Sequence, residues 1–237
     1  MKTPLGFPRG LYGITPEWSD TQRLVAAVEA AASGGMVALQ WRRKTATRRE
    51  GEHQARALAT TCKSLGIVYI INDDWRLALA LDADGAHLGR DDGALIQARQ
   101  ALGPDKILGC SCYNDPALAQ QALAVGVDYI AFGAMYPSSV KPDAARATLD
   151  HVRAGRTLAE QNRAARIRAE QARTGRARAD HATPRAVVVA IGGLTADNAA
   201  PVIRAGADSI ALINGLFGAP DIRAAARRCQ DLFETRN

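Results

Sequence analysis

Side chains that can bind anions alternate at the end of an early apolar run in this 237-residue chain. Gln40, Arg42 and Lys44 are spaced two apart where the run at residues 36–41 ends. In an extended strand this spacing places all three side chains on one side. One amide and two cations together suit an anionic substrate that carries a polar heterocycle, and an exposed basic loop is the alternative.

Two carboxylates follow the next two apolar runs. Asp73 comes after the run at residues 67–71, and Asp92 comes after the run at residues 85–88. Mg2+ is commonly held by one or two carboxylates, with water and substrate phosphates in its other positions. Each acid could instead cap a following helix. Their place beside the cationic cluster favours a Mg2+ site, whereas His87 is interpreted as a packed, hydrogen-bonded strand residue.

Two hydroxyls and a further cation follow later runs. Ser111 ends the run at residues 107–111, and Ser138 and Lys141 come after the run at residues 129–132. If these runs are parallel strands, their carboxyl ends meet at one edge. The hydroxyls and the cation then join the same anion-binding mouth.

Glycine-rich turns follow the last two apolar runs. Gly193 ends the first turn, and Ile213 and Asn214 open the second. Glycine lets a backbone approach an anion closely, and N–H groups at a helix N-terminus bind phosphate, although glycines also serve ordinary turns. Together with the cationic cluster, these turns predict a separate, neutral phosphate site and therefore two phosphorylated small-molecule substrates.

Eight short apolar runs supply the elements that must position these residues. Strands are expected at residues 10–15, 36–41, 67–71, 85–88, 107–111, 129–132, 186–191 and 209–213. Amphipathic, helix-like segments separate them at residues 20–33, 48–65, 75–81, 95–102, 115–125 and 196–205, and the last runs from 222 to 234. This α/β alternation predicts a (β/α)8 TIM barrel, with a doubly wound open sheet as the alternative. Polar clusters after nearly every strand favour the barrel, because an open sheet concentrates its site at one switch point.

One interval, between Lys141 and Val189, is too long for a barrel helix and its loops. We therefore expect a single barrel domain over residues 1–237, with an Arg-rich helical or disordered insertion at about 145–183. Residues 142–185 hold ten Arg, no Lys and five acidic residues, so +5 of the chain's net charge of +6 lies there. A solvated helical face is favoured over a nucleic-acid-binding arm, because no aromatic residue interleaves the arginines.

The composition is that of a globular protein with a large core, at 47% hydrophobic and 23% charged residues. No apolar stretch approaches the roughly 18–20 residues of a membrane span, and the polar N-terminus is unlike a signal peptide. The four cysteines lack zinc spacing and are expected to be reduced thiols. These features predict a cytoplasmic protein without a membrane partner, and they leave a homo-oligomer open.

Taken in order, these residues resemble the thiamine-phosphate synthase family. The shared blocks begin with Leu-Tyr-x-Ile-Thr and end with Ala-Gly-Ala-Asp, and they fall at residues 11–15, 40–44, 71–73, 84–92, 109–111, 128–129, 190–193, 198 and 205–208. The likeness covers nearly the whole chain except residues 142–185. It implies a barrel enzyme that joins hydroxymethylpyrimidine diphosphate to thiazole phosphate and releases pyrophosphate.

The resemblance also implies a role for each residue singled out above. Asp73 and Asp92 would ligate Mg2+, and Gln40 would contact the pyrimidine. The diphosphate would be held by Arg42, Lys44, Asn72, Ser111 and Lys141, and the thiazole phosphate by Ser138, Gly193, Ile213 and Asn214. The implied mechanism is largely dissociative: pyrophosphate departs, and the thiazole nitrogen captures the pyrimidine methylene cation.

Some positions depart from the family pattern. Val140 stands where a second hydroxyl is common, Asn214 replaces a common Ser, and Tyr113 a frequent His. One competing interpretation is a thiazole tautomerase-like barrel, which would need an acid–base residue but no diphosphate cluster. Another is a non-catalytic protein that binds a phosphorylated ligand and docks a partner through its Arg-rich stretch.

Overall fold

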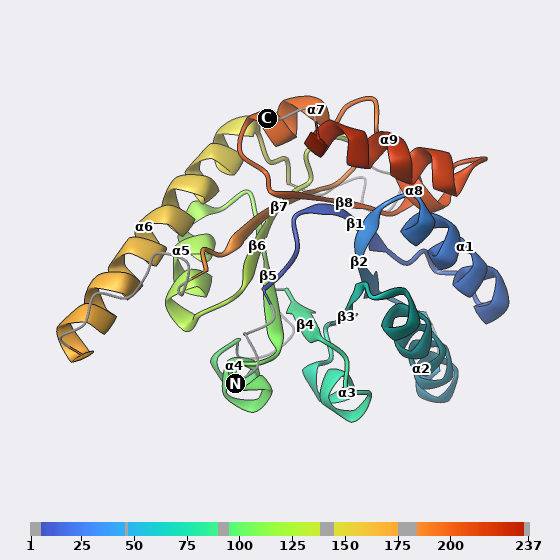
Figure 1. The fold of residues 1–237 in the computed structure, drawn as a ribbon, viewed down its shortest axis with the longest axis horizontal. Coiled ribbons are helices and arrows are strands. Elements are labelled where there is room, and N and C mark those ends of the chain that lie inside the picture. Colours follow the sequence, from blue (N-terminus) through green and yellow to red (C-terminus); the bar gives the residue numbers. More distant parts are fainter. Residues whose placement is uncertain (1–5, 46, 90–94, 138–144, 175–183, 235–237) are drawn as a thin grey trace.

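The structure is a computed structural model, and it describes residues 6–45, 47–89, 95–137, 145–174 and 184–234. Eight parallel strands close into a barrel in chain order, and β8 hydrogen-bonds back to β1 (Figure 1). This closure confirms the (β/α)8 barrel and excludes the open sheet. The strands are β1 (Gly10–Ile14), β2 (Met36–Trp41), β3 (Val68–Asn72), β4 (Gly85–Leu88), β5 (Ile107–Tyr113), β6 (Tyr129–Phe132), β7 (Val187–Ile191) and β8 (Ser209–Leu212).

Helices lie outside the strands and cover the barrel (Figure 1). They are α1 (Thr21–Ser33), α2 (Arg48–Leu65), α3 (Trp75–Ala80), α4 (Leu95–Leu102), α5 (Pro116–Val125), α6 (Leu149–Thr174), α7 (Ala200–Arg204), α8 (Asn214–Phe217) and α9 (Ile222–Glu234). Several begin where the sequence offers a cap: Asp20 caps α1, Asp115 caps α5, and Thr47 with Glu50 forms a capping box on α2. No helix within the described ranges is both long and apolar enough to cross a membrane.

The apolar core has two layers, because each buried strand presents side chains to both faces. One layer fills the barrel's interior, where Phe7, Tyr12 and Tyr129 pack with small and β-branched residues of the other strands. The larger layer lies between the strands and the surrounding helices. The floor of the barrel is therefore packed.

Three aspartates fasten the opposite, N-terminal rim of the barrel by one repeated contact. Asp84, Asp128 and Asp208 each directly precede an even-numbered strand. Each carboxylate accepts a hydrogen bond from the backbone N–H of the second residue of the strand before it. The donors are Tyr69, Leu108 and Val188, and the N–O distances are 2.8–3.0 Å. Although the family likeness includes all three aspartates, they lie away from the mouth, and their contacts join neighbouring strands.

The Arg-rich stretch forms α6, which occupies the position of the barrel's own sixth helix. Its first turns pack against β6, β7 and α5, with Val152, Gly155 and Ala159 buried. A Cβ on Gly155 would lie 2.3 Å from the Phe132 ring, so glycine allows this helix to approach β6 closely. Beyond these turns the helix is polar, and its far end projects past the barrel (Figure 1).

The expected element boundaries needed a few corrections. The helix expected at residues 196–205 is shorter and starts at Ala200, because a turn held by Asn198 precedes it. Strand β5 continues two residues past Ser111, across an irregularity in its pairing with β6. The four-residue helix α8 was not predicted from the sequence. The expected insertion at about 145–183 stays a prediction, and its described part is α6 with the residues that lead into it.

Candidate active site

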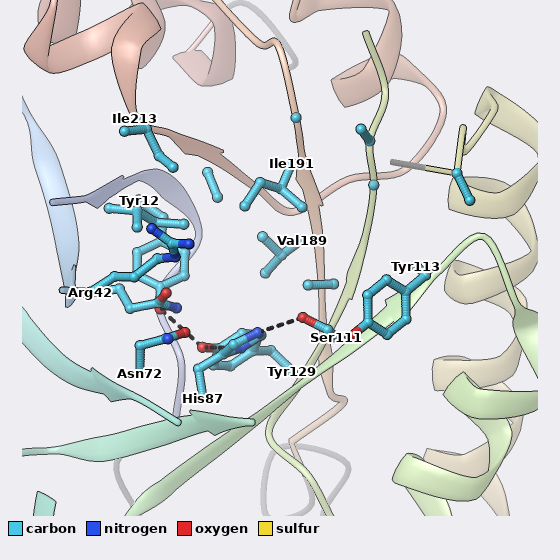
Figure 2. Close-up of a pocket in the computed structure, with 18 residues that line it drawn as sticks. Tyr12, Arg42, Asn72, His87, Ser111, Tyr113, Tyr129, Val189, Ile191 and Ile213 are labelled. Atoms are coloured by element: carbon cyan, nitrogen blue, oxygen red, sulfur yellow. Dashed lines mark hydrogen bonds between the residues drawn. The ribbon is translucent and has the colours of Figure 1, made fainter. Parts of the chain in front are cut away.

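A cavity of about 370 Å3 opens at the carboxyl ends of the strands, within the size range of small-molecule sites. Side chains from or just after all eight strands line it, and Figure 2 shows them pointing inward together. We call it the first cavity. Five of the predicted site residues line it: Gln40, Arg42, Asn72, Ser111 and Ile213. The expected alternation is therefore visible at the end of β2, where Gln40 and Arg42, one residue beyond the strand, face the same space.

A continuous chain of hydrogen bonds lies at the base of the first cavity (Figure 2). Nε2 of Gln40 donates to the Tyr12 hydroxyl over 2.8 Å, and that hydroxyl lies 3.0 Å from the hydroxyl of Tyr129. The ring nitrogens of His87 continue the chain, with Nδ1 2.9 Å from Tyr129 and Nε2 2.8 Å from Oγ of Ser111. Burial raises the pKa of both tyrosine hydroxyls above the ordinary value, so both stay protonated.

Glu17 organises the cationic rim of the first cavity, a role that the sequence analysis missed. Its carboxylate accepts from Nη1 of Arg42 over 2.9 Å and from the backbone N–H of Lys44 over 3.1 Å. Thr15 fixes the same loop, because its hydroxyl accepts from the Arg42 N–H and donates to the Arg42 carbonyl. The available signal was an acidic residue two positions after Thr15, close in sequence to the expected first strand.

Asp73 lies at the end of β3 with its carboxylate 3.1 Å from Nζ of Lys44. Its φ of 65° is left-handed, a conformation that Asp tolerates better than most residues, and its N–H donates to the His87 carbonyl. The neighbouring Asp74 caps α3 by accepting from the Leu77 N–H. The capping role therefore falls to Asp74, which leaves the Asp73 carboxylate at the rim.

A second cavity, of about 230 Å3, adjoins the first and shares Gly192 and Ile213 with it. The predicted residues Gly193, Ile213 and Asn214 line this space. Gly193 has a φ of +62°, and a Cβ there would lie 2.4 Å from the Pro137 carbonyl oxygen, so only glycine fits. Asn198 holds this turn by donating to the Gly193 carbonyl and accepting from the Thr195 N–H.

Three predicted site residues, Asp92, Ser138 and Lys141, lie outside the described residues. Within the described ranges, no group of three or more His, Cys, Asp or Glu side chains could hold a metal ion together. Of the two carboxylates predicted to hold Mg2+, Asp73 is described, and it lies directly after β3 beside Lys44.

Comparison with known proteins identifies the family. The sequence model of a family described as thiamine monophosphate synthase matches residues 11–216. This chain belongs to the thiamine monophosphate synthase family. The match begins in β1 and ends in α8, so it covers every strand and both cavities.

Individual members of this family are similar over nearly their whole length. A protein of Bordetella pertussis named thiamine-phosphate synthase is 53% identical over 98% of each chain, and one from Bordetella avium is 55% identical over 97% of each. A solved structure described as thiamine phosphate pyrophosphorylase from Pyrococcus furiosus is 30% identical, with a TM-score of 0.74 over 95% of this chain and 96% of that one.

Proposed function

We propose that this chain couples hydroxymethylpyrimidine diphosphate to thiazole phosphate and forms thiamine phosphate and pyrophosphate. The observation that carries the proposal is the pair of adjoining cavities in a member of this family. One cavity has the Gln40 and Asn72 amides and the Arg42 guanidinium on its wall, and the other has a glycine turn that admits an anion close to the backbone. A shared wall allows two substrates to meet, which a tautomerase acting on one substrate does not require.

The diphosphate half of the site is formed by the rim of the first cavity. Arg42 and Lys44, held by Glu17, are cations that bind the departing diphosphate, with Asn72, Ser111 and Lys141 as further donors. Gln40 contacts the pyrimidine, because its amide lies deeper in the same cavity and is only 3% exposed. Negative charge grows on the leaving group as its bond to the methylene carbon breaks, so preorganised donors stabilise the transition state more than the substrate.

The thiazole phosphate half is formed by the second cavity. Gly193, Ile213 and Asn214 surround the phosphate. Ser138, which follows Pro137 in the sequence, is assigned to the same phosphate. The turn held by Asn198 keeps backbone groups in place before the substrate arrives. This arrangement holds the thiazole nitrogen beside the methylene carbon, which it attacks once pyrophosphate has left.

The residues at the rim fit a bound Mg2+, the cofactor that we propose. Asp73 would hold it together with Asp92, and the Lys44 ammonium 3.1 Å from Asp73 marks a place where this carboxylate already meets a cation. Few protein ligands are needed, because substrate phosphates supply the others. Bound Mg2+ would neutralise charge on the diphosphate oxygens.

The same proposal places the enzyme in the cytoplasm, which suits its four free cysteine thiols.

The test is an assay of the purified chain with both substrates, in Mg2+ and after addition of EDTA. We expect thiamine phosphate and pyrophosphate in equal amounts with Mg2+, and a loss of at least about 100-fold in rate with EDTA, since the metal contributes several kcal/mol. Absence of product from a protein that still binds thiazole phosphate would overturn the synthase proposal. Isomerisation of the thiazole phosphate without coupling would support the tautomerase instead.

Substituting Gly193 tests the second cavity separately. In Gly193→Ala, we expect the KM for thiazole phosphate to rise at least about tenfold, because both the positive φ and the contact with Pro137 disfavour a Cβ. The KM for the pyrimidine diphosphate should change little. Gly66→Ala is the matched control: its φ is +66°, but a Cβ there meets nothing within 4 Å. Equal effects of the two variants on thiazole phosphate would remove Gly193 from the site.

A further inference from the structure

The hydrogen-bond chain at the base of the first cavity joins two proposed substrate-binding residues. Three side chains lie between them, and none of the three has been assigned a contact with either substrate. Gln40 on β2 and Ser111 on β5 are its ends, and Tyr12, Tyr129 and His87 lie between them (Figure 2). Both tyrosines are fully buried, with exposures of 1% and 0%. Buried hydroxyls need partners, so this chain is held in one arrangement.

The direction of donation along the chain follows from which groups carry protons. The side-chain nitrogen of Gln40 can only donate, so the Tyr12 hydroxyl accepts from it. Among the described residues, the Tyr129 hydroxyl is the one acceptor within reach of the Tyr12 proton, so Tyr12 donates to Tyr129. The Tyr129 proton then points to Nδ1 of His87, which must accept. A neutral imidazole that accepts at Nδ1 carries its proton on Nε2 and donates to Oγ of Ser111.

The two ends of the chain consequently present opposite groups to the cavity. The Ser111 hydroxyl already accepts from His87, and the described residues offer its proton no other acceptor, so that proton is available to a ligand. At the other end, Gln40 uses its nitrogen on Tyr12 and keeps its carbonyl oxygen as an acceptor. A donor suits a diphosphate oxygen, and an acceptor suits an N–H of a heterocycle.

We propose that His87 is a positioning residue for the coupling reaction: by donating from Nε2, it keeps the Ser111 hydroxyl turned outward as a donor to the diphosphate. The inference rests on the proposed function, because it takes a diphosphate as the ligand. With the other tautomer, His87 would accept the Ser111 proton, and the serine would turn lone pairs toward an anion. The buried tyrosines disfavour this alternative, because the Tyr129 proton and a proton on Nδ1 would then compete for one position.

A spectroscopic test addresses the tautomer directly. In protein labelled with 15N-histidine, we expect the His87 signal, assigned by its loss in His87→Gln, to show a protonated Nε2 and an unprotonated Nδ1. In Tyr129→Phe, which removes the hydroxyl beside Nδ1, the signal should shift toward a mixture of tautomers. A protonated Nδ1 in the unmodified protein would overturn the proposal, whatever the outcome of the coupling assay.

A double-mutant cycle tests whether His87 acts through Ser111. The probe is inorganic pyrophosphate with Mg2+, measured by calorimetry. We expect Ser111→Ala and His87→Met each to weaken binding about tenfold, the order of one hydrogen bond to a charged group. The double variant should be no weaker than either, because both remove the same donor. His87→Gln, whose amide nitrogen can still donate to Ser111, should stay within about threefold of the unmodified protein.

Additive effects in this cycle would overturn the proposal, as would a His87→Met protein that loses thermal stability but keeps its pyrophosphate affinity. If His87→Met does not fold, the same cycle with Tyr129→Phe in its place decides, since this change removes one oxygen and keeps the ring packing. Failure of the coupling assay alone would count against the proposed function. The tautomer and the pyrophosphate cycle would still decide the role of His87.

Discussion

Replacing Arg42 with methionine is expected to lower kcat for thiamine phosphate formation by about 10²–10³-fold, the effect of removing one preorganised donor from a developing anion. Arg42 lines the first cavity, its side chain is 16% exposed, and Glu17 fixes its guanidinium. Methionine preserves much of the apolar stem and removes the charge. Steady-state rates at saturating concentrations of both substrates, with circular dichroism to verify folding, measure the effect.

The matched control is Arg43→Met, which makes the same charge change one residue further along the same loop. Arg43 lines neither of the two cavities. We expect kcat to stay within about threefold. A similar loss in both variants would mean that only the net charge of the loop matters, and it would contradict a specific contact between Arg42 and the diphosphate.

Glu17→Gln provides an intermediate case. The glutamine keeps an acceptor for the Lys44 N–H but loses the ion pair with Arg42. The change should therefore act mainly by loosening the position of the Arg42 guanidinium. We expect kcat to fall, but by less than in Arg42→Met.

The fold was predictable because periodicity in this chain is strong. The runs at residues 36–41, 85–88 and 129–132 became strands with the expected bounds, since each is short, buried and mostly apolar, as is typical of a parallel strand. The same two-residue period placed Gln40 and Arg42 in one cavity. Where one period dominates, sequence determines which face a side chain occupies.

Contacts between segments far apart in sequence were not predictable. Glu17 meets Arg42 across 25 residues, and Tyr12 meets Tyr129 across 117. These pairs form only once the barrel closes and brings strand ends together. The short α8 was missed for a related reason: four residues carry no periodic signal, and its start at Asn214 has no side-chain cap.

His87 illustrates the same limit more closely. The sequence predicted a packed, hydrogen-bonded strand residue at this position, and the structure places it in hydrogen bonds in the cavity wall. A strand residue of this barrel can be both packed and turned to the site, because the interior-facing side chains form the floor of the mouth.

The largest loss of stability is expected from Asp208→Ala, at the end of the barrel opposite the site. The Asp208 carboxylate is 1% exposed, and it accepts from the Val188 N–H and from Nη2 of Arg185, whose side chain is 8% exposed. Removing it leaves a buried cation and a strand N–H without this partner, a change that costs about 3–5 kcal/mol. Arg9 and Arg156 lose the same carboxylate, but they are more exposed and contribute less.

Urea denaturation should show this loss as a lower free energy of unfolding. Thermal denaturation should show a Tm lower by roughly 10 °C for a chain of this length. Asp150→Ala is the matched control, because its ion pair with Arg153 joins side chains that are 86% and 59% exposed, and it should cost less than about 0.5 kcal/mol. The kcat of Asp208→Ala, measured well below its Tm, should stay near that of the unmodified protein, since its contacts lie away from both cavities. A Tm within about 2 °C of the unmodified protein would contradict the role given to Asp208. It would also imply that the matching contacts of Asp84 and Asp128 hold the rim without it, because the three aspartates make the same bond on successive strand pairs.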